Sequence, residues 1–237
     1  MEFNIDKCYL LSITLEKKRK ISSEYTMDGK KVKPVQSTKY LGVTINNQLK
    51  WDEHVENVCG TASKLLGFLR RTLHKCPEDI KEKAYKSLVR PRLEYSSSVW
   101  DPYKQKHIDK VEMVQRQAAR FVKNAPHRMK ADQPSVTAMV KDLGWETLQS
   151  RRKTGRLTML YKITNELVAM PHHYHPRPQP QQNRGHPHQF LHHQPSVDAY
   201  KYAFLPRTII DWNALPSQVF TAESVNSFKQ RLQSCNY

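Results

Sequence analysis

The chain has 237 residues, enough for one large domain or two small ones, and its 38% share of hydrophobic residues is below the usual value for globular proteins. Its net charge of +17 at pH 7 favours a polyanionic partner, although a charge that only keeps the protein soluble is the alternative. Four cysteines without a CxxC pair exclude a zinc finger and a dense disulfide framework. Without an apolar run of roughly 18 residues or the features of a signal peptide, the protein is expected to be intracellular, in the nucleus or the cytoplasm.

The first 48 residues predict a small antiparallel β-sheet. Residues 3–14 favour a strand, and the basic run at 17–20 favours an exposed loop. Asp28-Gly29 is typical of a hairpin turn, and residues 33–45 supply the next pair of strands. A sheet of this size is not stable by itself, so another part of the chain must cover its apolar face.

Helical periodicity dominates after residue 50. Pro77 is typical of a first helical turn, Ile80, Ala84 and Leu88 form an apolar stripe after it, and Pro91 is expected to end this helix. Six further helices are predicted. The first has an apolar stripe over 55–69, the second stops at Asp101-Pro102, and the third has an apolar stripe over 108–121 and ends before Pro126. The fourth has its N-cap at Ser135 and Gly144 past its end, the fifth spans 145–167, and the sixth has its N-cap at Ser224.

Residues 171–200 carry seven of the eleven histidines, many prolines and glutamines, and almost nothing apolar. Because such a stretch buries too little surface to offset its ordering entropy, it predicts a linker or exposed loop. His172, His173 and His175 lie close together, but no carboxylate or thiolate accompanies them at a ligand spacing. Low-complexity sequence is therefore favoured over a metal site.

Two of the predicted helices carry a polar stripe opposite their apolar one. Glycines in such a stripe let a partner backbone come close, and cations there would contact phosphates. The alternative is an ordinary solvated face, with Glu112 and Arg116 as an i,i+4 pair. The stripes consist of Gly60, Lys64, Gly67 and Arg71 in the first helix, and of Arg116, Arg120 and Lys123 in the second.

No catalytic motif is present: the chain has no GxSxG, P-loop or HExxH. The serines at 96–98 beside Glu94 favour a helix end over a hydrolase site. No two adjacent carboxylates stand in an apolar strand, as a two-metal polymerase or nuclease requires.

Five stretches, in the order "KYLGVTINNQLKWDEHV", "KLLGFLRRTLHKCP", "AYKSLVRPRLEYSSSVWDPY", "VEMVQRQAARFV" and "FLPRTIIDWNALP", resemble the C-terminal part of reverse transcriptases from non-LTR, LINE-like retrotransposons. The resemblance runs from Phe3 to Phe228. It implies that residues 3–14 are the last palm strand, that residues 51–123 are the thumb, and that Tyr40, Leu41, Gly42 and Val43 are the primer grip.

The resemblance also implies a binding role without catalysis. The family's catalytic Ala-Asp-Asp turn would precede Met1, and this chain contains no Asp-Asp pair and no zinc knuckle. We therefore expect a truncated reverse transcriptase-like protein that binds primer–template nucleic acid, not a membrane, and that is inactive alone. No cofactor is expected in this chain, whereas Mg²⁺ is expected for the full-length family enzyme. A helical interaction protein and a non-functional retrotransposon remnant are the alternatives.

The expected fold class is α+β, mainly α-helical, with a small N-terminal antiparallel β-sheet followed by a helical thumb-like bundle and a helical C-terminal region. The expected segments are a palm remnant with a primer-grip-like hairpin (1–50), a thumb-like helical domain (51–125), a helical extension (126–170), a His/Pro/Gln-rich linker (171–200) and a C-terminal segment with a short helix (201–237).

Overall fold

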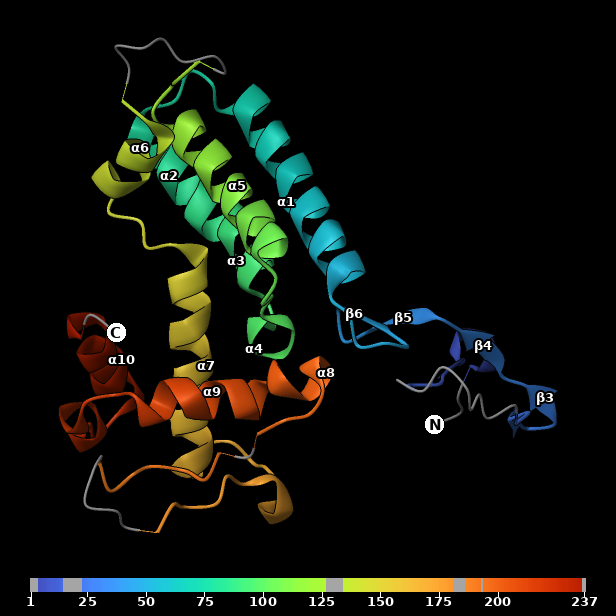
Figure 1. The fold of residues 1–237 in the computed structure, drawn as a ribbon. Helices are drawn as coiled ribbons and strands as arrows, with labels where there is room; N and C mark the ends of the chain where they lie inside the picture. Colours follow the sequence, from blue (N-terminus) through green and yellow to red (C-terminus); the bar gives the residue numbers. More distant parts are fainter. Residues whose placement is uncertain (1–3, 15–22, 127–133, 181–185, 193, 236–237) are drawn as a thin grey trace. The chain divides into compact units, whose positions relative to one another are not determined.

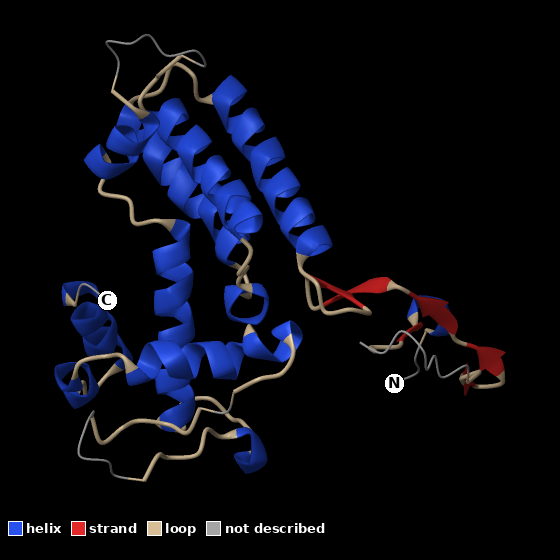
Figure 2. Cartoon of the chain, in the orientation of Figure 1, coloured by secondary structure: helices blue, strands red, loops and turns tan. Residues whose placement is uncertain are grey.

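The computed structural model describes residues 4–14, 23–126, 134–180, 186–192 and 194–235. It is mainly helical, with short paired strands near the N-terminus, which confirms the predicted fold class (Figures 1 and 2). The chain separates into two compact units, Met1–Val58 and Cys59–Tyr237. The finer division into five segments stays a prediction, and the loop expected at residues 17–20 lies outside the described residues.

The N-terminal unit holds three two-stranded pairs in place of the single expected sheet. Only part of the first expected strand forms, because the Asn4 side chain accepts a hydrogen bond from the Asp6 amide at 3.0 Å and starts a 3-10 turn over Ile5–Lys7. The strands are β1 (Tyr9–Leu11) parallel to β4 (Lys33–Val35), β2 (Thr26–Met27) antiparallel to β3 (Lys30–Lys31) around the predicted Asp28-Gly29 turn, and β5 (Ser37–Tyr40) antiparallel to β6 (Val43–Asn46).

Helices dominate the described residues after Lys50. The predicted caps at Ser135 and Ser224 are confirmed, since their side chains accept hydrogen bonds from the Ala138 and Ser227 amides. Two helices near the C-terminus, α8 and α9, were not predicted. The helices are α1 (Asp52–Thr72), α2 (Glu78–Ala84), α3 (Arg90–Glu94), α4 (Ser97–Trp100), α5 (Gln105–Val122), α6 (Val136–Asp142), α7 (Leu148–Thr164), α8 (Asp198–Lys201), α9 (Phe204–Asn213) and α10 (Val225–Ser234), with 3-10 turns at His172–Tyr174 and Ser217–Thr221.

Pro91 does not end its helix, contrary to the prediction. A π-helical turn over Tyr85–Val89 joins α2 directly to α3, and the Arg90 amide donates to the Tyr85 carbonyl. A proline inside an α-helix loses one hydrogen bond and clashes with the carbonyl four residues earlier. The widened π turn just before Pro91 relieves that clash, so the helix continues to Glu94.

The predicted apolar stripe of α2 is also wrong. Ile80 and Leu88 are 40% and 49% exposed, whereas Lys81, Tyr85 and Val89 are buried. Tyr85 is drawn inward because its ring stacks on that of Trp145, with centroids 4.6 Å apart, and its hydroxyl donates to the Gln115 side chain at 2.9 Å. Aromatic stacking and a satisfied hydroxyl outweigh the burial of an isoleucine and a leucine.

The C-terminal helices pack on α7 around an apolar cluster that includes Leu157, Leu160, Trp212, Phe228 and Leu232. Part of the histidine-rich tract docks on this cluster: Phe190 packs against it, His186 is only 6% exposed, and the Trp212 indole donates to the His188 carbonyl at 2.8 Å. The expectation of an exposed loop is therefore wrong for His186, which is buried, and for Gln189 and Phe190, which are partly buried, whereas Pro187 and His188 are exposed as expected. Hydrogen bonds between the tract and Trp212 and Asn213 of α9 hold these residues in place.

A buried ionic cluster holds the end of α4, α7 and α9 together. Asp101, 6% exposed, accepts from Arg152 at 2.7 Å and from Arg156 at 2.9 Å, and its carboxylate lies 3.3 Å from Arg207. Arg156 also reaches Asp211 at 3.0 Å. The cluster contains three guanidinium groups and only two carboxylates. Because the Asp101 carboxylate contacts all three guanidinium groups, the packing of these helices depends on its charge.

Candidate nucleic-acid interface

The hairpin formed by β5 and β6 carries the four residues predicted as a primer grip. Its loop is Leu41-Gly42, and both residues have positive φ (45° and 85°), as the tight type I′ turn requires. Tyr40 and Leu41 are 64% and 73% exposed, whereas Val43 is buried at 5%. The hairpin therefore presents an aromatic and an apolar side chain to solvent from a strained turn.

The start of α1 braces this hairpin. The Thr44 amide donates to Nδ1 of His54 at 3.1 Å, and the Asn57 side chain donates to the Thr44 hydroxyl at 3.4 Å. The Asn46 side chain accepts from the Lys50 amide at 2.8 Å, which turns the chain from strand into helix. Burial, helped by the charge of Lys39, lowers the pKa of His54 and so favours the neutral ring that this acceptor role needs.

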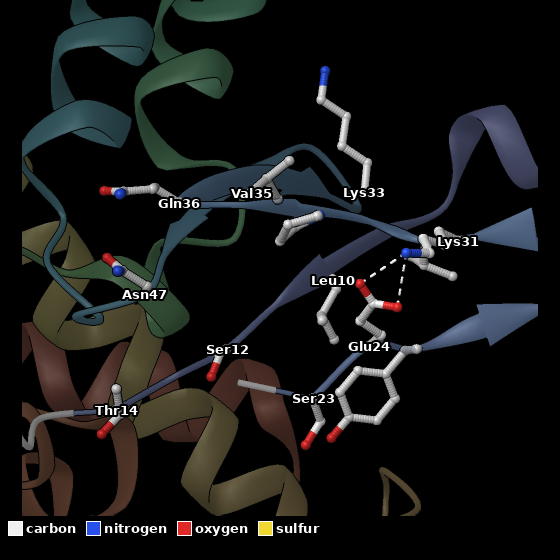
Figure 3. A pocket seen from close by; sticks show the side chains of 13 residues that line it. Leu10, Ser12, Thr14, Ser23, Glu24, Lys31, Lys33, Val35, Gln36 and Asn47 are labelled. Carbon is white, nitrogen blue, oxygen red and sulfur yellow. Dashed lines mark hydrogen bonds and ion pairs between the residues drawn. The ribbon is translucent and has the colours of Figure 1, made fainter. Parts of the chain in front are cut away.

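A cavity of about 660 Å³ lies in the N-terminal unit, lined by residues of β1, β3 and β4 and their flanks (Figure 3). It adjoins the base of the hairpin, since the Asn47 amide donates to the Gln36 carbonyl at 2.9 Å and both residues line it. Lys31 and Glu24 line this cavity and form an exposed ion pair, with Nζ of Lys31 2.8 Å from Oε2 of Glu24. Among the residues that line it, none belongs to the predicted site.

The polar stripe of α1 faces solvent as predicted from its spacing. Lys64 and Arg71 are exposed, on the side of the helix opposite the buried Ala62 and Leu66. A Cβ at Gly60 would meet nothing within 4 Å, and one at Gly67 only the Arg71 guanidinium at 3.7 Å. The chain's own packing does not demand these glycines, and the role assigned to them stays a prediction.

The polar stripe of α5 is divided by its contacts. Arg116 is exposed, while Lys123 forms ion pairs with Glu78 at 3.0 Å and Asp142 at 2.7 Å. Those two carboxylates raise the pKa of Lys123 through their hydrogen bonds. Glu112, which the solvated-face alternative pairs with Arg116, accepts with its carboxylate from the Gln149 amide at 2.8 Å and so caps α7.

Arg120, the middle residue of the α5 stripe, lines another pocket of about 270 Å³. The pocket brings together Arg70 from α1, His74, Lys81 from α2, and Phe121 and Asn124 at the end of α5. Sequence reasoning missed Arg70, which flanks the α1 stripe, and Lys81, which lies outside the apolar stripe predicted for α2. The position of Lys81 directly after Ile80 of the predicted apolar stripe was the only signal in the sequence that could have indicated its burial.

The described residues contain no helix long and apolar enough to cross a membrane. Within the same part of the chain, no group of three or more His, Cys, Asp or Glu is arranged to hold a metal ion.

Comparison with known proteins gives one informative similarity. Over 147 residues, 61% of this chain, the sequence is 24% identical to the RNA-directed DNA polymerase from mobile element jockey of Drosophila melanogaster. The chain spans only 16% of that polymerase's length. No family model matches, and no solved structure matches. The similarity indicates that the chain contains a reverse transcriptase-like region.

Proposed function

We propose that this chain binds primer–template nucleic acid as the primer-grip and thumb part of a non-LTR reverse transcriptase. The similarity to the jockey polymerase supports the reverse transcriptase origin. The chain's order, a braced hairpin followed by a basic helical region, matches the order expected of a grip and a thumb.

The exposed, braced tip of the β5–β6 hairpin is the observation that carries this proposal. Tyr40 offers an aromatic face on which a base or sugar can stack, and Leu41 stands beside it. His54 and Asn57 hold the strand behind this tip, so ligand binding does not have to pay for ordering it. Later in the chain, Lys64, Arg71 and Arg116 add exposed positive charge that attracts phosphates.

The salt dependence of binding to a fluorescent RNA–DNA duplex tests the proposal. Each neutralised phosphate contributes about −0.9 to the slope of log affinity against log salt concentration. Lys64→Ala with Arg116→Ala is expected to flatten this slope by roughly two units. Lys141→Ala with Lys229→Ala removes the same charge from α6 and α10 and should leave the slope nearly unchanged. Equal effects of both pairs would show that the +17 charge attracts nucleic acid diffusely.

The hairpin is tested separately, by Tyr40→Ala. Loss of one stacking contact is expected to weaken duplex binding by about 1–3 kcal/mol, roughly 5- to 150-fold, with the salt slope unchanged. An unaltered affinity would remove Tyr40 from the interface.

Polymerase activity of the chain alone is not expected. Two-metal phosphoryl transfer needs a clamp of carboxylates, and the sequence has no Asp-Asp pair to provide the family's clamp. Primer extension on an RNA template with Mg²⁺ or Mn²⁺ is the test, and template-dependent extension by the purified chain would contradict this part of the proposal.

A protein-interaction role is the second candidate, favoured by the exposure of Ile80 and Leu88 on one side of the α2–α3 helix. Ile80→Lys with Leu88→Lys separates the two: self-association or partner binding would be lost, while duplex affinity would be kept.

A further inference from the structure

The pocket lined by Arg70, His74, Lys81 and Arg120 is positively charged without any compensating charge of its own. Its remaining lining residues are Phe121, Asn124 and Ala125, so it has no carboxylate in its wall. Glu78 lies one helical turn before Lys81, but its carboxylate is bound to Lys123 at 3.0 Å. The same lysine holds Asp142 at 2.7 Å, so both of these carboxylates are already paired.

Lys81 is buried against neutral partners. Its side chain is among the most deeply buried of the protein, with 1% of the residue exposed. Its ammonium donates to the Asn124 side-chain oxygen and lies 5.7 Å from the centre of the Phe121 ring. A buried ammonium normally needs an anionic partner, because a neutral amide and a ring offset only part of its desolvation cost.

Arg120 and Arg70 add two further cations with spare donors. Nε of Arg120 is buried and, among the described residues, has no hydrogen-bond partner. One guanidinium N–H of Arg70 donates to the Gln117 carbonyl at 2.7 Å. Burial, together with the charge of Arg120, lowers the pKa of Arg70. Two guanidiniums that repel one another while a donor stays unfilled are a site prepared for an anion.

The end of α5 explains the shape of the pocket but not its charge. Asn124 takes a left-handed conformation with φ of 51°, and the Ala125 amide donates to the Arg120 carbonyl at 2.9 Å, which closes the helix. This turn aims the Asn124 side chain at Lys81. The helix dipole contributes about half a negative charge at such an end, which is too little to balance Arg70, Lys81 and Arg120.

We propose that this pocket, at the ends of α1 and α5 and on α2, binds one phosphate group. Arg120 and Arg70 supply planar donors for its oxygens, and Lys81 supplies a buried point charge. This inference rests on the proposed nucleic-acid binding for the source of the phosphate, a phosphodiester of the duplex backbone. Figure 1 shows α1, α2 and α5, the helices that carry Arg70, Lys81 and Arg120.

Duplex binding of Arg120→Gln, Arg70→Gln and the double variant tests the proposal, with Lys229→Gln on α10 as the control for lost charge. If both arginines hold the same phosphate, each single variant flattens the salt slope by about one unit and the double variant by about one unit also, not two. Arg70→Lys keeps the charge and should keep the wild-type salt slope, which tests the role of this charge if Arg70→Gln does not fold, as judged by its thermal unfolding midpoint. A double variant that loses two units, or single variants that behave like Lys229→Gln, would overturn the proposal.

A second measurement separates this pocket from the proposed function. The Nε–H resonance of Arg120 is followed by NMR while inorganic phosphate, and then the duplex, is added to the wild-type chain. A shift with both probes is expected. If the duplex does not bind but inorganic phosphate shifts this resonance, the proposed function fails and the phosphate site stands. If the duplex binds without moving the resonance and phosphate does not move it either, the proposed function stands and the pocket proposal fails.

Discussion

Replacing Asp101 with asparagine should be one of the most destabilising single changes in the protein. The Asp101 carboxylate is 5% exposed and faces the side chains of Arg152, Arg156 and Arg207, of which the first is fully buried. Asparagine keeps the shape and one acceptor oxygen but removes the charge. Two guanidinium nitrogens of Arg152 already lack a hydrogen-bond partner among the described residues, so within this part of the chain no second anion replaces Asp101 as the partner of Arg152.

The expected magnitude follows from burial. Breaking a buried ion pair by removing one partner costs about 3–5 kcal/mol, because a charge stays desolvated without its counter-ion. Asp211 continues to hold Arg156 at 3.0 Å, which limits the loss to one or two of the three cations. We therefore expect a loss near 3–4 kcal/mol, a large part of the 5–15 kcal/mol typical of whole domains. Urea unfolding followed by tryptophan fluorescence measures it, since Trp100 is adjacent and fully buried.

Two further variants make this test specific. Asp79→Asn breaks the exposed Lys83–Asp79 pair, in which both side chains are more than half exposed, and should cost less than about 1 kcal/mol. Asp101→Asn combined with Arg152→Met removes the stranded cation and should recover part of the lost stability. The reasoning is refuted if Asp101→Asn costs no more than Asp79→Asn, or if the added Arg152→Met makes the protein still less stable.

Three other predictions concern the hairpin and the histidine-rich tract. The folded-state pKa of His54 lies below its ordinary value of 6.5, so its contribution to stability should be complete above about pH 6.5 and should be lost as the pH falls through the folded-state pKa. Urea titrations of the wild type and of His54→Gln between about pH 5 and 7 check this. Curves of unfolding free energy against pH that run parallel for the two proteins would contradict it. Leu41→Asn should raise the thermal unfolding midpoint through a gain of about 0.5–1 kcal/mol, since asparagine tolerates positive φ better than leucine, and it should weaken duplex binding if Leu41 contacts the ligand. Phe190→Ala should lower stability by roughly 2 kcal/mol, whereas His192→Ala on the exposed part of the tract should be neutral within about 0.5 kcal/mol in the same calorimetric measurement.

Local signals in the sequence were sufficient for features that depend on neighbouring residues. The caps at Ser135 and Ser224 and the Asp28-Gly29 turn are each formed by contacts within a few positions of the chain. The apolar face of α5 is visible in the helical period of its own residues. The amphipathic period of α1 also placed Lys64 and Arg71 on the solvent side. Such features follow from propensity and periodicity alone.

The features that sequence patterns did not predict depend on contacts between residues far apart in the chain. The burial of Lys81 in place of Ile80 depends on Phe121 and Asn124, some forty residues away in the chain. The docking of 186–190 depends on carbonyl and side-chain groups of Trp212 and Asn213. Periodicity within α2 or composition within the histidine-rich tract contains no information about these partners, so both predictions failed for the same physical reason.

The β5–β6 hairpin combines strain with exposure in a way that favours a binding role over a structural one. A leucine at positive φ costs of order 1 kcal/mol, and the side chain of Leu41 recovers little of it by burial, since 73% of the residue is exposed. The turn keeps its shape because α1 holds the following strand through His54 and Asn57. A strained, solvent-facing apolar side chain on a braced support gains its missing burial only when a ligand covers it. This is the physical reason to look for the nucleic acid at Leu41 and Tyr40 first.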